Sequence, residues 1–253
     1  MKKIFTFLAA SAMLFAANAQ EKVYVHTKGV AYEFDAADID VINFEKGSDI
    51  EGALQERWIA KMEFVDLGLS VKWATCNLGA ETPADYGDYY AWGETKAKEK
   101  YTTGNNAWYN VPKATLNADG VIDDNDNLTA QYDAATAVCE DWRMPTSAEI
   151  DELCKLKSEL STMKDASGNE VTGLLFHGEG EKSDNTLFIP FAGYRLGLDL
   201  DNAGLHGRCW SATACEVDVY AYILHVDSEN VLKDDINGAR NRGYSVRPVL
   251  NKK

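Results

Sequence analysis

A stretch rich in aromatic residues, positions 86–109, holds the side chains of this chain best suited to binding a ligand. Its seven aromatic residues alternate with glycine, asparagine and threonine without regular periodicity. This pattern predicts a loop, with one short strand at 88–92. Aromatic faces bind sugar rings and apolar protein side chains, and neighbouring asparagines can add hydrogen bonds. We predict ligand contacts at Trp92, Trp108 and Tyr109; the alternative is that the loop buries its own rings.

A second polar group lies in the acidic segment DGVIDDNDN, residues 119–127. Calcium takes about six to eight oxygen ligands, which clustered carboxylates and amides can supply. No glutamate closes a twelve-residue loop, so the EF-hand pattern is not met. The candidate calcium ligands are Asp119, Asp123, Asp124 and Asp126. The alternative is a solvated acidic turn without metal, and no other cofactor is expected.

The five cysteines allow a redox or disulfide interpretation. Cys209 and Cys215 are close enough in sequence to pair across a turn, whereas the alternative is that the cysteines are small buried apolar residues. There is no CxxC motif and the four histidines are spread along the chain, so no zinc site is predicted. GxSxG and HExxH motifs are also missing, which favours a protein without enzymatic activity. A carboxylate pair for glycoside hydrolysis stays open in so acidic a chain.

The first twenty residues, MKKIFTFLAASAMLFAANAQ, have the pattern of a signal peptide. Two lysines precede an apolar run that is too short to span a membrane, and Ala-Asn-Ala ends at residue 19. We therefore expect a signal peptide over 1–19 and an exported protein without a transmembrane segment, in the periplasm, at the cell surface or outside the cell. The formal net charge of −15 argues against nucleic acid as a partner, because an acidic surface repels phosphates.

Short elements must position these candidate sites. Alternating apolar residues on both sides of Lys28-Gly29 predict a hairpin, and DVINF at 40–44 predicts a further short strand. We predict a small β module over 20–46, a linker over 47–61 and a main domain over 62–250.

Two helices are predicted in the main domain. The first covers 132–140, with apolar residues on one face. The second begins after Thr146, whose spacing to Glu149 is that of a capping box, and an apolar stripe continues to Leu160. Two short strands are expected around Gly68, and the last third is rich in short strands. Together these elements predict an α+β fold.

Several runs in order resemble one known family. They are FVDLGLSVKWATCNLGAETPADYGDYYAWGET, DAATAV, WRMPTSAEIDEL, FIPFAGYR, CWSAT and GYSVRPV. Over about residues 63–249 the chain resembles the Fibrobacter succinogenes major paralogous domain family, which is similar to the C-type-lectin-like fold of formylglycine-generating enzymes and retroelement-diversified binding proteins. The resemblance implies two helices with a twisted, mostly antiparallel sheet, preceded by the small β leader of exported gut-bacterial-type proteins.

The same resemblance implies roles for residues late in the chain. Ligand contacts are implied for the following residues of the late loops and strands: Tyr220, Tyr222, Arg240 and Arg242. Scaffold roles are implied for residues within the shared motifs: Trp142, Arg143, Trp210 and Arg247. Of these, Arg143 is expected to bond backbone or an acid, and Arg247 a carboxylate. The segment between residues 108 and 133 departs from the family pattern, because it is longer and more acidic than the usual connection.

Three functional hypotheses follow. The leading one is an exported, non-enzymatic ligand-binding or adhesion-type protein that recognises a glycan or a protein surface. The second is a structural or assembly subunit of a surface appendage, with the β module as docking element. The third, a thiol-dependent oxidase related to formylglycine-generating enzymes, requires Cys209 and Cys215 to lie side by side.

Overall fold

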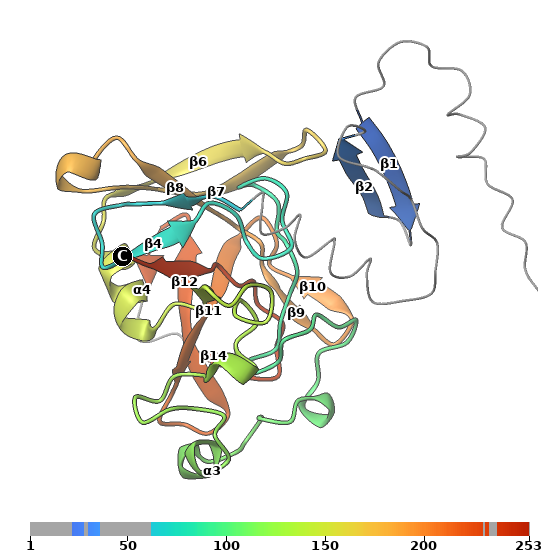
Figure 1. Ribbon diagram of the computed structural model, residues 1–253, viewed down its shortest axis with the longest axis vertical. Coiled ribbons are helices and arrows are strands. Elements are labelled where there is room, and N and C mark those ends of the chain that lie inside the picture. The colour runs from blue at the N-terminus through green and yellow to red at the C-terminus, as the bar shows by residue number, and fades with distance from the viewer. Residues whose placement is uncertain (1–21, 28–29, 36–61, 230, 233–236, 253) are drawn as a thin grey trace, which may run out of the picture. The chain divides into compact units, whose positions relative to one another are not determined.

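The chain divides into two units between Ile50 and Glu51 in the computed structural model (Figure 1). The structure describes residues 22–27, 30–35, 62–229, 231–232 and 237–252. The predicted signal peptide over 1–19, the predicted linker over 47–61 and the predicted strand at 40–44 fall outside the described residues.

The first unit contains the predicted hairpin. Strand β1 (Lys22–Thr27) pairs antiparallel with β2 (Val30–Asp35), and Thr27 lies opposite Val30. The predicted antiparallel pairing of these two strands is confirmed.

In the second unit, a four-stranded sheet joins residues from both ends of that unit. Its order is β3 (Phe64–Val65), β4 (Val71–Ala74), β15 (Val249–Asn251) and β5 (Trp142–Arg143), with antiparallel pairing throughout. Figure 1 shows the cyan β4 beside the dark red β15. The two strands predicted around Gly68 are thus confirmed.

Helix α4 (Ser147–Cys154) begins at the predicted capping box. The hydroxyl of Thr146 accepts the Glu149 amide at 3.3 Å, and the Glu149 carboxylate accepts the Thr146 amide at 2.8 Å. That carboxylate also binds both terminal nitrogens of Arg143, at 2.7 and 2.5 Å. The prediction that Arg143 bonds an acid is confirmed, and the bond ties the helix start to β5. Leu160, predicted to extend the helical stripe, lies instead in strand β6 and is 55% exposed.

The helix predicted over 132–140 is wrong, because Asp133, inside that span, is extended and its carboxylate bonds an amide beyond the span. One oxygen of its carboxylate accepts the amides of Ala135 and Thr136, and the other accepts that of Met144 at 2.8 Å. These bonds hold Asp133 in an extended conformation between a 3-10 turn, η3 (Ala130–Tyr132), and a series of turns. The helix that does form nearby is α3 (Lys113–Ala118), which the sequence pattern did not indicate.

The last third contains the predicted strands. One sheet has the order β6 (Ser158–Lys164), β7 (Glu170–His177) and β8 (Thr186–Pro190). In a second sheet, β12 (Tyr220–Asp227) pairs with β11 (His206–Ala214), β13 (Val231–Leu232) and β14 (Asn237–Ala239). A hairpin is formed by β9 (Tyr194–Leu196) and β10 (Asp199–Asp201). Two further 3-10 turns are η2 (Thr103–Asn105) and η4 (Gly180–Lys182).

Tryptophans and arginines fill the centre of the second unit. Trp210 is fully buried and its indole nitrogen donates to the Tyr90 carbonyl at 2.7 Å, while Trp142 is 5% exposed and packs against Phe64. Both occupy the scaffold positions implied by their motifs.

Arg247 is also fully buried, but the expectation of a carboxylate partner is wrong. Its Nε donates to the amide oxygen of Asn77 at 2.9 Å, and its Nη1 donates to the carbonyls of Ala74 and Thr75 at 3.1 and 2.7 Å. Neutral acceptors therefore hold this buried guanidinium at the end of β4.

Every pairing between the named strands is antiparallel, and two α-helices accompany them among the described residues. The fold class is therefore α+β with mostly antiparallel sheets, as predicted. Within the described part of the chain, neither α3 nor α4 has the length and apolar character needed to cross a bilayer.

Candidate ligand-binding site

A surface hollow of about 550 Å³ brings together three of the predicted ligand contacts. Its lining comes from η2, the loop that follows η2, β9, β12, β14 and the turn after β14. The lining residues are Thr103, Tyr109, Leu196, Tyr220, Ala239, Asn241 and Arg242. Predicted contacts from the aromatic loop and from the late strands, about a hundred residues apart in sequence, therefore share one site.

Trp108 holds the loop that presents Tyr109. Its indole nitrogen donates to the Gly93 carbonyl at 3.1 Å, and its ring meets Tyr132 edge-on with centroids 5.2 Å apart. Trp108 is half-buried and does not line the hollow, whereas the next residue, Tyr109, does. Trp108 is therefore not a ligand contact as predicted, and its role is to position the loop that carries Tyr109.

Trp92 and Arg240 are both fully buried, so the predictions that they contact a ligand are wrong. The Trp92 indole donates to the Ser211 carbonyl at 3.1 Å, and the Arg240 guanidinium lies over the Trp92 ring at 4.8 Å. Arg240 also donates to the carbonyls of Tyr220 at 2.9 Å and Val111 at 2.8 Å. It thereby ties β12 to the loop behind the hollow. Burial lowers the pKa of its guanidinium.

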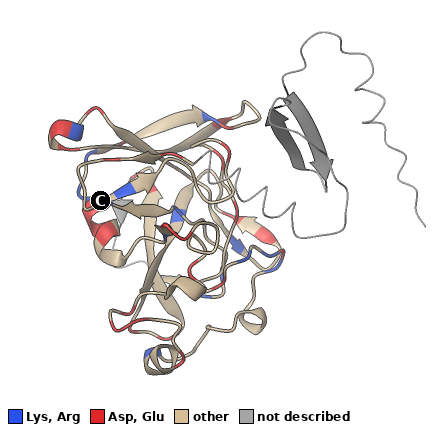
Figure 2. Ribbon diagram, viewed as in Figure 1, with Lys and Arg blue, Asp and Glu red and all other residues tan. Residues whose placement is uncertain are grey.

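Arg242 is the charged residue of the lining. Its guanidinium lies 5.1 Å from the centroid of the Tyr194 ring, and that ring also carries Arg208 at 4.7 Å. Cation–π contacts of this kind hold an arginine without using all of its hydrogen-bond donors. Figure 2 shows acidic residues spread over many loops and turns, so a half-buried arginine in a hollow stands out against an acidic chain.

Tyr220 and Tyr222 belong to the same strand but have different surroundings. Tyr220 lines the hollow and is 36% exposed, while Tyr222 is half-buried and is not among the lining residues. The prediction of a ligand contact is therefore retained for Tyr220 and withdrawn for Tyr222. Chemically, the hollow offers two aromatic rings, an amide and a guanidinium.

The acidic loop does not gather its carboxylates around a common point, so the predicted calcium ligands are wrong. Lys113 lies 2.6 Å from Asp126 and thus places a cation there already. Asp123 accepts the amides of its own loop, and Asp124 accepts the Asn117 amide group at 3.3 Å. Asp119 ends α3 as its C-cap. In the described part of the chain, the one grouping of three or more His, Cys, Asp or Glu ligands lies elsewhere.

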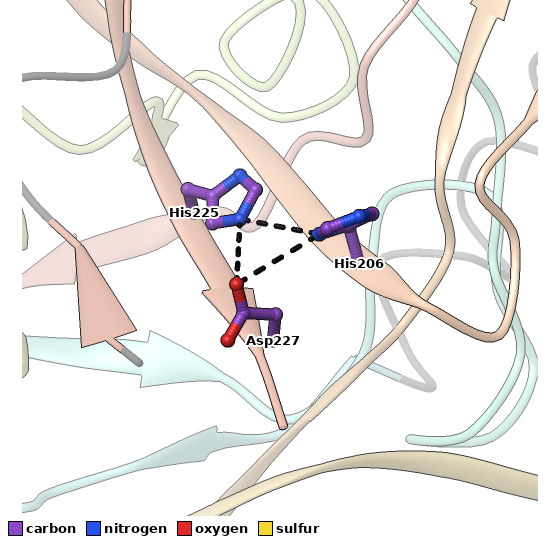
Figure 3. A group of neighbouring side chains, drawn as sticks. All are labelled: His206, His225 and Asp227. Carbon is purple, nitrogen blue, oxygen red and sulfur yellow. Dashed lines mark hydrogen bonds and ion pairs between the residues drawn. The ribbon is translucent and has the colours of Figure 1, made fainter. Parts of the chain in front are cut away.

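That grouping consists of His206, His225 and Asp227 (Figure 3). In the register of β11 and β12, His206 lies opposite Asp227, and Arg208 lies opposite His225. His206 Nδ1 is 3.3 Å from His225 Nε2, and Asp227 Oδ2 is 3.4 Å from the same nitrogen. Sequence reasoning missed this cluster, because strand pairing rather than sequence spacing unites it. The sequence offered only a partial signal, the His-x-Asp alternation at 225–227, which does not include His206.

All five cysteines lie among the described residues and are reduced. Cys209 belongs to β11 and Cys215 follows its end. Cys209 lies opposite Leu224 and Ala214 opposite Ala221, three residues along β12, so Cys215 is roughly 10 Å or more from Cys209, whereas a disulfide needs about 6 Å between Cα atoms. The predicted pairing across a turn therefore does not form, because both cysteines follow the course of one strand.

Thiol labelling should follow this arrangement. Burial raises the pKa of the Cys209 thiol to about 11 and that of Cys215 to about 12. At pH 8 we expect iodoacetamide to label both at least ~100-fold more slowly than in the unfolded chain, because the thiolate is the reactive form. Peptide mass spectrometry with and without denaturant measures the ratio. The half-buried Cys139 is the internal comparison, and fast labelling of Cys209 in the folded chain would contradict the expectation.

No family model, no curated protein and no solved structure matches this chain.

Proposed function

We propose that the chain is an exported, non-enzymatic binding protein of adhesion type, and that its ligand is a glycan carrying an anionic substituent. The observation that carries the proposal is the hollow shared by Tyr109, Tyr220 and Arg242. The apolar face of a sugar ring packs on tyrosine, its hydroxyls bond amides such as that of Asn241, and a carboxylate or sulfate pairs with a guanidinium.

Electrostatics favour an anionic group on the glycan. The net charge of −15 repels anions over most of the surface, so an acidic ligand needs a local cation. Arg242 supplies that cation within the hollow and is held over Tyr194 before any ligand arrives. An arginine that is already oriented loses less side-chain entropy on binding.

A C-type-lectin-like fold is part of the same proposal. The support for it is the resemblance of WRMPTSAEIDEL, CWSAT and GYSVRPV to the Fibrobacter succinogenes major paralogous domain family, together with the α+β class. Fold likeness alone is a weak argument for function, so the proposal depends on the hollow.

The binding test begins with an array of neutral and acidic glycans. We expect acidic glycans to be retained, and binding of the best one to weaken about 10-fold or more in Arg242→Gln, because a bond to a charged group is lost. Tyr109→Ala should weaken it roughly 3- to 10-fold through loss of the aromatic contact. Titration calorimetry with that glycan measures both changes.

Arg195→Gln is the matched control for charge. Arg195 belongs to β9, lies over Tyr89 and does not line this hollow, so the variant removes an equal charge without changing a lining residue. Equal losses in Arg195→Gln and Arg242→Gln would show that binding depends on net charge rather than on the hollow. If Arg242→Gln and Arg195→Gln both retained neutral glycans, the ligand would not need an anionic substituent and that part of the proposal would be rejected.

A second candidate, recognition of a protein surface during adhesion or appendage assembly, is favoured by one observation. Exposed leucines gather on the β9–β10 hairpin and the turn after it: Leu196, Leu198, Leu200 and Leu205. Solvent-exposed apolar side chains that lie close together in sequence are typical of surfaces that bind another protein. This candidate would be favoured if the chain bound no glycan on the array but bound a surface protein, and if Leu198→Asp abolished that protein binding.

A further inference from the structure

We infer that His206, His225 and Asp227 form a binding site for a divalent transition-metal ion such as Zn²⁺, with Arg208 as a cation that competes for His225. The site is separate from the proposed glycan hollow, since none of the four residues lines it. Its three donors are two imidazole nitrogens and one carboxylate oxygen, a set that zinc and its neighbours accept and calcium does not favour.

The spacing of the donor atoms carries the inference. In a tetrahedral zinc site, bonds of about 2.0–2.1 Å place any two ligand atoms about 3.3–3.4 Å apart. The separations here are 3.3 Å from His206 Nδ1 to His225 Nε2, 3.4 Å from His225 Nε2 to Asp227 Oδ2, and 3.9 Å from His206 Nδ1 to Asp227 Oδ2. Two edges already match, and the third requires a shift of about half an ångström to do so.

The surroundings orient the donors. Asp227 Oδ1 accepts the Glu229 amide at 2.8 Å, which turns Oδ2 toward the two rings (Figure 3). His225 is buried with 4% of its side chain exposed, whereas His206 retains 30% and Asp227 20%. An ion would thus have a fixed donor on the inner side and a path from solvent on the outer side. A fourth position stays open to water.

Arg208 opposes the ion. Its Nε donates to His225 Nδ1 at 3.1 Å, so a neutral His225 ring carries its proton on Nε2, the nitrogen that faces the other two donors. Binding therefore requires that this proton move to Nδ1 and that Arg208 withdraw. The same guanidinium also lies over Tyr194 at 4.7 Å and Tyr244 at 5.9 Å, contacts that can still hold it once the bond to His225 is broken.

Because Arg208 competes with the ion, replacing Arg208 and replacing a ligand should change the zinc affinity in opposite directions. Zinc chloride is titrated calorimetrically into the purified full chain at neutral pH, with circular dichroism to verify folding. We expect saturable binding of one ion. Arg208→Met should tighten it at least about 10-fold, because a like charge and a competing donor are removed while the aliphatic stem remains. His206→Ala and Asp227→Asn should each weaken it at least about 10-fold.

His177→Ala is the matched control. That histidine lies on another sheet, 3.1 Å from Glu159, and its loss should leave the zinc affinity unchanged. Calcium chloride should give no saturable binding at this site. Absence of saturable zinc binding in both the unsubstituted chain and Arg208→Met, or equal weakening by His177→Ala and Asp227→Asn, would overturn the inference. The Arg242→Gln variant should bind zinc normally, which separates this result from the glycan proposal.

Discussion

Replacing Arg247 with alanine should lower the free energy of unfolding by about 4 kcal/mol, because two buried acceptors and one half-buried acceptor lose their donors and a cavity replaces the side chain. The acceptors are the amide oxygen of Asn77 and the carbonyls of Ala74 and Thr75. Burial lowers the pKa of this guanidinium, but an arginine stays protonated. The charge is therefore stabilised by neutral oxygens.

Arg247→Lys should recover little of that loss. An ammonium group carries a point charge on a flexible stem and cannot reproduce a planar fork that serves Asn77 and two carbonyls together. Urea unfolding followed by tryptophan fluorescence gives the free energies.

Arg143→Ala is the matched control for this measurement. Its guanidinium binds Glu149 bidentately, but 29% of the Arg143 side chain is exposed, so solvent screens the pair. We expect a loss of about 1 kcal/mol. If the Arg143 and Arg247 variants unfold at the same urea concentration, the buried hydrogen bonds of Arg247 do not contribute the free energy of unfolding assigned to them.

Gly193→Ala should destabilise the chain by about 3 kcal/mol or more, since two separate costs add. Gly193 has a φ of +63°, a left-handed conformation that alanine adopts with strain. A methyl group there would also lie 2.2 Å from the Asp201 carbonyl oxygen and 2.6 Å from the Ala203 nitrogen. Both neighbours are backbone atoms and cannot rotate away.

Gly197→Ala, in the turn between β9 and β10, separates the two costs four residues along the chain. Gly197 has a φ of +62°, nearly that of Gly193, but no atom lies within 4 Å of its added methyl group. We expect a loss of about 1 kcal/mol from backbone strain alone. Thermal and urea unfolding of both variants measures the difference. Equal losses would mean that the hairpin shifts freely to accept the methyl group at Gly193.

Local signals in the sequence were sufficient where the structure depends on near neighbours. The start of α4 was predicted because Thr146 and Glu149 interact across three residues. The strands around Gly68 and the hairpin at 22–35 followed from alternation. The helix over 132–140 failed because the side chain of Asp133 bonds Met144, eleven residues away, and apolar periodicity does not report such a bond.

The candidate site shows the same limit. Arg240 and Arg242 lie two residues apart, and the family resemblance implied the same ligand-binding role for both. Packing separates them: Arg240 is buried against Trp92, and Arg242 lines the hollow. The histidine cluster depends wholly on which residues of β11 and β12 face each other. Only cross-strand register, which a single sequence does not specify, could have placed His206 opposite Asp227.

The position of β15 has a consequence for the order in which the second unit can fold. This strand lies between β4 and β5, so that sheet cannot assemble before residues 249–251 have been synthesised. Pairing Val249 with Trp73 closes a loop of roughly 175 residues, a long-range contact of the kind that slows folding. Until β15 is in place, β3 and β4 therefore lack the partner that joins them to β5. Shortening the chain by its last five residues would remove the central strand of this sheet and leave the edges of β4 and β5 exposed.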